Sequence, residues 1–490
     1  APSRPLLIAT IVVVLAFTVL RFITAATLDL RTDEAYYWTW ADQYVLSYLD
    51  HPPMVAWVER LGIAIFGNTP LGVRFGQLLM LPMIELILAD IARRRTRSWN
   101  AALFVVLAME CTLNYGVFSV VVEPNLPLLL FTGAMIWALS RLDETGDARW
   151  WLAIGTAAGL AALSKCLVAL LVPAVVVFLL LPAGRKALAT PWPYAGAVLA
   201  LAVFSPVLVW NAQHGWASFA FQGTRLSAGG SAGDYLARYA LYEVLWLGPV
   251  LFLSVLAGTV ALLIRGLRRS ETFAVALAVA VLAPVGYMTW RSLDLWINQS
   301  WTWVFWPLGI LALALVLPWG RAPRVVAALT AVIVTIGLPL PLAVFYHASF
   351  DRSAWFGAGD PFGQDAGFDD LAPRALALAR DHDAGWIAAT EYRLYAALQW
   401  QIGRDIPVVL VTQRVRFLDF KPLALPAGRA LYIYSDEPDP LLAATSLTPL
   451  DPMLVTWRGE KMRTLQAALL DGFVPELNPP PGSPFYVAAP

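Results

Sequence analysis

Apolar runs long enough to cross a lipid bilayer recur along the first 345 residues, and they restrict the fold more than any other feature. A membrane-spanning helix needs about 17–25 predominantly apolar residues, and 59% of this chain is hydrophobic while only 14% is charged. We read the first run as a retained helix rather than a secretory signal, because it exceeds a usual signal core and more runs follow. The pattern predicts about eleven helices, near residues 6–24, 71–91, 99–118, 125–141, 150–165, 166–183, 192–210, 243–264, 271–289, 301–318 and 325–345.

Basic residues in the connecting loops predict which side of the membrane each loop occupies. If the N-terminus is cytoplasmic, every compact basic cluster falls on the cytoplasmic side, as the positive-inside rule requires. The clusters are Arg93, Arg94, Arg95 and Arg97; Arg141 and Arg149; Arg185 and Lys186; Arg265, Arg268 and Arg269; and Arg321 and Arg324. An odd number of spans then places the C-terminus on the opposite side.

The composition changes near residue 355, where charges become more frequent and short apolar strands alternate with helical patterns. We expect helices at 371–380, 392–401 and 461–470, and strands at 385–389, 406–411 and 430–434. The Gly-rich stretch 357–367 lacks the Lys-Ser/Thr of a phosphate-binding loop and is interpreted as a linker. The chain is therefore predicted to be a polytopic α-helical membrane domain over residues 1–350, with a first outer loop at 25–70, followed by a small extracytoplasmic α/β domain over 351–490.

The reactive side chains gather on the predicted outer side, most densely just after the first span. Charges at the membrane boundary are costly and indicate a functional site. The adjacent carboxylates of Asp33 and Glu34 can supply a general base or bind a cation, unless they belong to a solvated loop. His51, before two prolines that fix the backbone, either holds a phosphate, supports the base, or is a hydrogen-bonded turn residue.

Later outer segments offer cations and sugar-binding groups. Lys165 lies at the break between two apolar runs, where it either snorkels to the interface or binds a lipid phosphate. Glu123 is either a site residue or a helix cap. Asn211 and His214, beside interfacial tryptophans, can bind sugar hydroxyls or phosphate. Further phosphate candidates are Arg225 and Arg291.

Several other classes of function have no support. A formal net charge of zero argues against a nucleic-acid partner. Cys111 and Cys166 both lie in apolar runs, which favours packing over a disulfide framework or a zinc site. Four scattered histidines form no metal-binding helix motif, so the metal content is unknown and a divalent cation is left open.

Four segments resemble the bacterial polytopic glycosyltransferases of the GT-C fold. They are residues 33–38 (DEAYYW), 48–57 (YLDHPPMVAW), 159–165 (GLAALSK) and 210–219 (WNAQHGWASF). The nearest branch looks like the lipid A/core galacturonosyltransferase group, which is related to the lipid A aminoarabinose transferase and to protein O-mannosyltransferases. Residues 386–392 and 413–416 also look like the periplasmic domain of that family.

The resemblance implies an inverting transferase in the bacterial inner membrane, with a cytoplasmic N-terminus and a periplasmic C-terminal domain. Its donor would be a sugar on a polyprenyl phosphate. By the family pattern Asp33 would take the acceptor proton, Glu34 would hold Asp33 or the sugar, and Lys165 would bind the donor phosphate. The resulting assignment is catalysis by Asp33 and Glu34, donor-phosphate binding by Lys165, His51, Arg225 and Arg291, and substrate binding by Arg31, Tyr36, Tyr37, Asp50, Glu123, Asn211 and His214.

The chain departs from the family pattern in two outer loops. The family often carries Pro-Asp-x-Pro after the third span, but here Asn125 replaces the acid, which has moved to Glu123. This change puts a cation site in that loop in doubt. A later loop that often reads Asn-Trp-Pro is replaced by residues 298–303 (NQSWTW), so sugar recognition is expected to differ.

The leading hypothesis is sugar transfer, with lipid A or lipopolysaccharide core as the first-ranked acceptor. Another envelope glycan ranks second, and a protein Ser or Thr ranks third. The expected partners are the donor lipid, a glycolipid or glycan acceptor, and membrane lipids. A transporter or flippase of lipid-linked sugar is the alternative, and it needs charges near the membrane midplane, where Glu85 and Glu110 are the main candidates. A receptor or scaffold is a third reading, which leaves the acidic first loop without a function.

Overall fold

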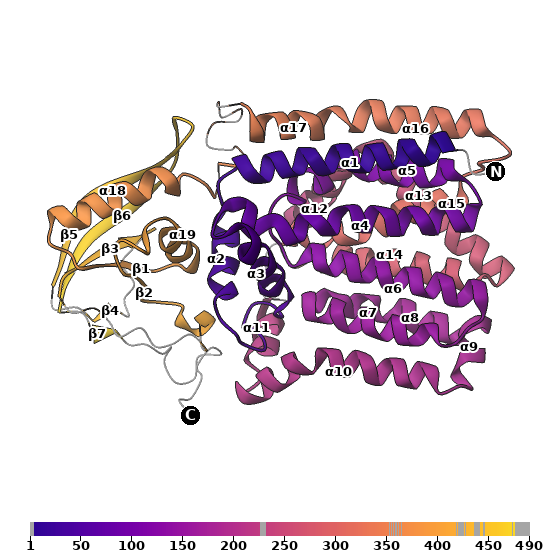
Figure 1. Ribbon diagram of the computed structural model, residues 1–490, viewed down its shortest axis with the longest axis horizontal. Helices are drawn as coiled ribbons and strands as arrows, with labels where there is room; N and C mark the ends of the chain where they lie inside the picture. Colours follow the sequence, from indigo (N-terminus) through magenta and orange to yellow (C-terminus); the bar gives the residue numbers. More distant parts are fainter. Residues whose placement is uncertain are drawn as a thin grey trace.

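The computed structural model describes residues 4–225, 232–351, 365–417 and 446–472, together with residues 353, 355, 357, 360, 362, 363, 419, 426, 428–435, 442, 443, 474 and 475. Long helices lie side by side through most of the molecule, and a sheet domain sits at one end of them (Figure 1). The chain starts at the opposite end, so α1 runs toward the sheet domain (Figure 1).

Seven helices or helix pairs of the described chain are long and apolar enough to cross a membrane: α1 (Arg4–Thr27), α4 (Pro70–Thr96), α6 (Asn125–Thr145), α10 (Trp192–Gln213), α13 (Pro249–Arg269), α14 (Thr272–Arg291) and α16 (Pro323–Gly337) with α17 (Pro339–Ser349). An eighth candidate joins the 3-10 helix Cys166–Leu171 and α8 (Val172–Leu180) to α9 (Pro182–Leu188), which bends away by 84°. Shorter apolar helices occupy the other predicted runs: α5 (Trp99–Glu110), α7 (Trp150–Ser164) and the segment Trp303–Val316, which contains α15 (Trp306–Val316). The chain is a multi-span membrane protein, and the count of eleven spans stays a prediction.

A buried ion cluster ties the first three spans together. The guanidinium of Arg21 on α1 donates to Glu110 at 2.9 and 2.5 Å and to Glu85 at 3.4 Å. All three side chains are buried, and charged residues inside a membrane protein persist when they are paired in this way. Glu85 and Glu110, named above as candidate midplane charges of a transporter, thus have a hydrogen-bonded packing role, and Arg21 is the partner that sequence reasoning missed.

Short helices cover the end of the bundle nearest the sheet domain. The first outer loop folds into α2 (Thr32–Ala41) and α3 (Met54–Phe66), which lie between the spans and the sheet domain (Figure 1). Further along the chain come the π-helix Asn114–Phe118, α11 (Ala217–Arg225), α12 (Ala232–Leu247) and the 3-10 helix Gln299–Trp301.

The C-terminal part contains a five-stranded sheet in the order β2-β1-β3-β6-β5. β1 pairs in parallel with β2 and β3, whereas β6 runs antiparallel to β3 and β5. The predicted elements at 371–380, 385–389, 392–401, 406–411 and 430–434 are confirmed. The elements are α18 (Phe368–Asp381), β1 (Trp386–Ala389), α19 (Tyr392–Ile402), β2 (Val408–Leu410), the 3-10 helix Arg414–Phe417, β3 (Ala430–Tyr434), β5 (Ser446–Trp457) and β6 (Glu460–Asp471), with β4 (Leu442–Ala443) and β7 (Val474–Pro475) as a separate pair.

The helix predicted at residues 461–470 is wrong, because this segment forms the strand β6. β6 is paired along both edges, with Leu469 opposite Leu431 of β3 and Thr464 opposite Leu454 of β5. Pairing on two sides overrides the helix preference of its alanines and leucines. The turn between β5 and β6 has positive φ at Arg458 (49°) and Gly459 (83°), which gives it the twist that a two-residue hairpin favours. Gly459 is the signal for this turn in the sequence.

The sheet domain and the first outer loop share one hydrophobic core. Tyr36 and Trp40 of α2 belong to the same buried cluster as Leu394 of α19 and Ile387 of β1. Burial of large aromatic side chains is among the strongest contributions to such an interface. The sheet domain is therefore held against the loop that carries the predicted catalytic residues.

Candidate active site

A cavity of about 450 Å³ lies where α2, the ends of several spans and the sheet domain meet. Its walls include eight of the residues predicted from sequence: Arg31, Asp33, Tyr36, Tyr37, Asp50, His51, Glu123 and Lys165. Groups that the sequence did not assign also line it, namely Tyr242, Trp246, Asn298, Ser300, Trp301, Asp365, Tyr392 and Arg393. Residues distant in sequence are thus assembled around one space.

Asp33 sits in the first turn of α2 and is held from the sheet domain. Arg393, at the start of α19, donates through Nε to Asp33 Oδ1 at 2.8 Å and through Nη2 to Oδ2 at 3.1 Å. The Asp33 side chain keeps 38% of its surface exposed, so it is accessible from the cavity. Burial opposes the charge of Arg393, but the Asp33 carboxylate outweighs it and raises the pKa of Arg393.

Glu34, the neighbouring acid, is fully buried and saturated with donors. Arg74 of α4 donates to both of its oxygens, at 2.7 and 2.6 Å, and the backbone amides of Arg31 and Val122 each donate at 3.0 Å. Arg74 also donates to the carbonyl of residue 25 in the last turn of α1 and to the carbonyls of residues 28 and 29 just after it. The pair fastens the first turn of α2 to the bundle and thereby fixes the direction of Asp33.

Asp50 is buried and receives two side-chain donors. The Tyr36 hydroxyl donates to its Oδ2 at 2.5 Å, and Arg416 pairs with its Oδ1. Burial and the Asp50 carboxylate raise the pKa of Tyr36, so this hydroxyl stays protonated as a donor. The Asp50–Arg416 pair is a second contact between the first loop and the sheet domain. Within the sheet domain, the Arg416 guanidinium also lies 4.1 Å from the centre of the Tyr392 ring.

Lys165, Asn125 and Glu123 form a chain of hydrogen bonds on the cavity wall. Lys165 ends α7 in an extended conformation, and its Nζ donates to Asn125 Oδ1 at 2.8 Å. Asn125 Nδ2 donates in turn to Glu123 Oε2 at 2.7 Å and to the Ser300 carbonyl at 2.7 Å. Burial raises the pKa of Glu123 to about 7, although Lys165 and Asn125 act to lower it. The residue that departs from the family pattern, Asn125, thus joins the predicted cation to the displaced acid.

Arg31 and Asp365 close another side of the cavity with an ion pair of 2.7 Å between Nη2 and Oδ2. Burial acts to raise the pKa of Asp365, but the Arg31 guanidinium outweighs it and lowers the pKa. Asp365 belongs to the stretch interpreted as a linker, so this segment contributes a charged group to the cavity.

A second cavity, of about 320 Å³ and mostly apolar, adjoins the first through shared walls. His51, Lys165 and Trp301 line both cavities. Its other walls come from the 3-10 helix after Lys165 and from α14, with Leu167, Leu170, Tyr287 and Met288 among them. A polar space and an apolar space therefore meet at Lys165.

Five predicted site residues do not line either cavity, namely the buried Glu34 described above and four residues of later segments. Asn211 donates within α10 to the Val207 carbonyl at 2.9 Å. His214 Nε2 lies 3.0 Å from Asp419 Oδ1, and its ring stacks on Trp210 at 4.2 Å, so it contacts the sheet domain. Arg291 pairs with Asp294 at 2.9 Å. Arg225 ends α11, and its side chain lies outside the described part of the chain.

Sequence reasoning missed the cationic partners of the acids. Arg393 directly follows segment 386–392, and Arg416 is the last residue of segment 413–416. The resemblance of these two segments to the family was the available signal for both arginines. Arg74 lies inside an apolar run, where a charge is a functional or structural marker. Among the residues that the structure describes, no three His, Cys, Asp or Glu side chains group as metal ligands would.

Comparisons with known proteins match parts of this sequence. The model of the dolichyl-phosphate-mannose-protein mannosyltransferase family matches residues 50–210. The lipid A galacturonosyltransferase RgtD of Rhizobium johnstonii is 30% identical over 216 residues, which are 42% of this chain and 43% of that protein. The undecaprenyl phosphate-alpha-4-amino-4-deoxy-L-arabinose arabinosyl transferase 2 of Proteus mirabilis is 28% identical over 137 residues, 27% of this chain and 24% of that protein. The matched part thus spans less than half of each of these relatives.

Solved structures extend the likeness to nearly the whole chain. ArnT from Cupriavidus metallidurans bound to undecaprenyl phosphate superposes with a TM-score of 0.61 at 17% identity, over 96% of this chain and 99% of that chain. The oligosaccharyltransferase AglB from Archaeoglobus fulgidus superposes with a TM-score of 0.53 at 11% identity, over 80% of this chain and 63% of that chain. The chain therefore has the fold of these two solved structures.

Proposed function

We propose that the protein is an inverting glycosyltransferase that moves a sugar from a polyprenyl-phosphate donor to a hydroxyl or phosphate of lipid A, lipopolysaccharide core or another envelope glycan. The reaction takes place at the periplasmic face of a bacterial inner membrane, with the N-terminus in the cytoplasm and the region after about residue 350 as a periplasmic domain. The names of the matched relatives, which include a lipid A galacturonosyltransferase, support this substrate class.

The observation that carries the proposal is that Asp33 and Lys165 face the same cavity. Sugar transfer from a phosphate needs a base beside the acceptor and fixed positive charge where the leaving phosphate gains its charge. Asp33 offers an accessible carboxylate, and Lys165 offers an ammonium at the junction with the apolar cavity. His51 lies at that junction as well.

The reaction balances with these groups. The acceptor oxygen forms a bond to the anomeric carbon of the sugar and gives its proton to Asp33. The bond between the anomeric carbon and the phosphate oxygen breaks, and its electron pair leaves with the polyprenyl phosphate toward Lys165. Attack from the side opposite the leaving group inverts the configuration.

The Arg393 contact is compatible with this role of Asp33. An ionised carboxylate has about four lone-pair sites, and Arg393 occupies one on each oxygen. The remaining sites can accept the hydroxyl proton while the guanidinium keeps the carboxylate oriented. Orientation of this kind accounts for much of the rate acceleration of a reaction between bound groups over the same reaction in solution.

The apolar cavity suits the first isoprene units of the donor. Its walls of Leu167, Leu170, Tyr287 and Met288 continue from Lys165, which would receive the phosphate. A lipid donor of this kind must react at the membrane boundary, where these two cavities meet.

The test is transfer by the purified protein with a panel of polyprenyl-phosphate sugars, with extracted lipid A as acceptor, with and without EDTA. Asp33→Asn should abolish transfer while donor binding persists, and Asp42→Asn, at an exposed acid of the same loop, should remain active. The EDTA lane reports whether a divalent cation is needed. Full activity of Asp33→Asn would reject the proposed base, and solute transport without sugar transfer from any donor would favour a flippase.

A further inference from the structure

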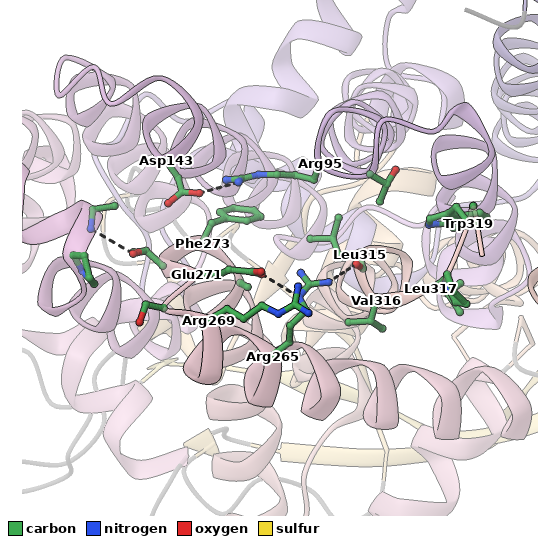
Figure 2. A pocket seen from close by; sticks show the side chains of 18 of the residues that line it. Arg95, Asp143, Arg265, Arg269, Glu271, Phe273, Leu315, Val316, Leu317 and Trp319 are labelled. Atoms are coloured by element: carbon green, nitrogen blue, oxygen red, sulfur yellow. Dashed lines mark hydrogen bonds and ion pairs between the residues drawn. The ribbon is translucent and has the colours of Figure 1, made fainter. Parts of the chain in front are cut away.

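Another cavity lies far from the candidate active site, at the other end of the helix bundle. It encloses about 930 Å³ between the end of α4, the end of α13, the start of α14 and the bent helix α9. Figure 1 places α9 at the end of the bundle away from α2 and the sheet domain. Figure 2 shows arginine side chains of α4 and α13 among the residues that line this cavity.

The walls of the cavity carry more positive than negative charge. Five basic and two acidic residues line it. Figure 2 shows how the two acids are used: Arg95 Nη1 donates to Asp143 at 2.8 Å, and Arg265 Nε donates to Glu271 at 3.0 Å. Each acid is thus neutralised by an arginine that stays in place.

The remaining three lining cations are Lys186 of α9, Arg269 of α13 and Arg321, which precedes α16. Within the described part of the chain, none of these three side chains makes a hydrogen bond or an ion pair. All three are exposed. Three cations that converge on one space without a protein acceptor leave it ready for an anion.

The cavity also has apolar walls, and an exposed apolar surface lies next to it. Leu315, Leu317 and Phe273 line it beside the cations. On the outer surface of α13, which carries Arg265 and Arg269, Ile264 is 44% exposed and Leu267 is 59% exposed. In a membrane protein such side chains contact acyl chains, so the cations lie where a lipid head group meets its tails.

We propose that this cavity binds the phosphate of an anionic membrane lipid. Guanidinium and ammonium groups are the usual partners of phosphate oxygens, and basic pockets between membrane helices bind anionic lipid head groups. The positive-inside rule explains why basic residues gather at this end, but it does not require that they line a cavity. The proposal is independent of the catalytic assignment above.

The chain offers a matched pair of double variants. Arg269→Gln with Arg321→Gln removes two unpaired cations from the cavity walls. Arg268→Gln with Arg324→Gln removes two exposed arginines from the same helix ends that are not among its lining residues. Both variants lower the net charge equally, and in the described structure neither removes a side-chain hydrogen bond or an ion pair. Their comparison therefore isolates the cavity from the general charge of this surface.

Binding would be measured on the full-length protein in detergent by native mass spectrometry, with dioleoylphosphatidylglycerol, dioleoylphosphatidylcholine and inorganic phosphate as probes. We expect tighter binding of the anionic lipid, weakened about 30-fold by the cavity variant and less than about threefold by the control, because each cation near a lipid surface contributes about a factor of five. Equal losses in both variants, or equal binding of the two lipids, would overturn the proposal. Binding of inorganic phosphate with the same variant pattern, and none of the lipid, would also overturn it in favour of a soluble anion.

Discussion

Arg393 and Asp33 form a two-bond ion pair, with Nε–Oδ1 and Nη2–Oδ2 distances of 2.8 and 3.1 Å, although 360 residues separate them in the chain. The pair joins α19 of the sheet domain to α2 of the first loop. The sheet domain thus contributes directly to the geometry of the proposed base, in addition to covering it.

Replacing Arg393 tests this contribution. Arg393→Gln should lower kcat about 10- to 100-fold, because a misdirected catalytic group costs rate even when substrates bind normally. The KM for the donor should change by less than about threefold, since Arg393 pairs with the base and Lys165 is the proposed phosphate ligand. Steady-state transfer with varied donor would separate the two parameters.

Arg380→Gln is the control for that experiment, since Arg380 is an exposed residue of the same domain on α18. It should leave both parameters unchanged. A large rise in donor KM with unchanged kcat in Arg393→Gln would instead assign Arg393 to donor binding.

Lys165→Ala should weaken the donor more than the acceptor. A hydrogen bond to a charged group contributes about 1.5–3 kcal/mol, so the donor KM should rise roughly 10- to 100-fold while the acceptor KM stays nearly constant. Lys461→Ala, at an exposed position of β6, serves as the control. Equal loss of affinity for both substrates would contradict the phosphate role of Lys165.

Much of the fold could be predicted because its signals are local. Each span is encoded by a continuous apolar run, and the strands of the sheet domain by short apolar segments between turns. The aromatic and acidic residues of the first loop lie within a few positions of one another, so Asp33, Tyr36 and Tyr37 could be assigned to one site. The structure brings them to one cavity with Lys165.

The unpredicted features depend on contacts between distant segments. Nothing near Glu34 in the sequence indicates that Arg74, 40 positions away, donates to both of its oxygens. The same holds for Arg416, which reaches Asp50 across 366 positions. β6 was read as a helix for a related reason, since its composition favours a helix and only its pairing with β3 and β5 makes it a strand.

Glu123 should make donor binding depend on pH near neutrality. Its pKa is raised to about 7, so the carboxyl is neutral below pH 7 and negative above it. The negative form faces the same cavity as Lys165 and opposes a phosphodiester donor, whose own charge is constant in this range. The donor KM of the wild type should therefore rise between about pH 6 and pH 8.

Glu123→Gln should remove that dependence, because the amide cannot ionise and still accepts the hydrogen bond from Asn125. Donor KM measured at intervals across this range would show a flat profile in the variant. His51→Gln, examined in parallel, shows whether the other titratable group at the junction of the two cavities contributes. A profile in Glu123→Gln that matches the wild type would reject Glu123 as the cause.

Glu34 and Glu59 provide a matched comparison of buried acids, since both side chains are fully buried in the first loop. Glu34 forms a buried ion pair with Arg74, so Glu34→Gln leaves a buried guanidinium uncompensated and should destabilise the protein by about 3 kcal/mol. Neither oxygen of Glu59 has a hydrogen-bond partner among the described residues, and burial together with the charge of Glu34 raises its pKa. Because the pKa of Glu59 is raised in the folded protein, ionisation of this carboxyl lowers the free energy of unfolding as the pH rises. Glu59→Gln should therefore leave thermal stability unchanged or increase it, most clearly at high pH. Thermal unfolding of both variants in detergent would check this pair of predictions. A loss of stability in Glu59→Gln as large as that in Glu34→Gln would contradict the second prediction and show that Glu59 has a charge partner.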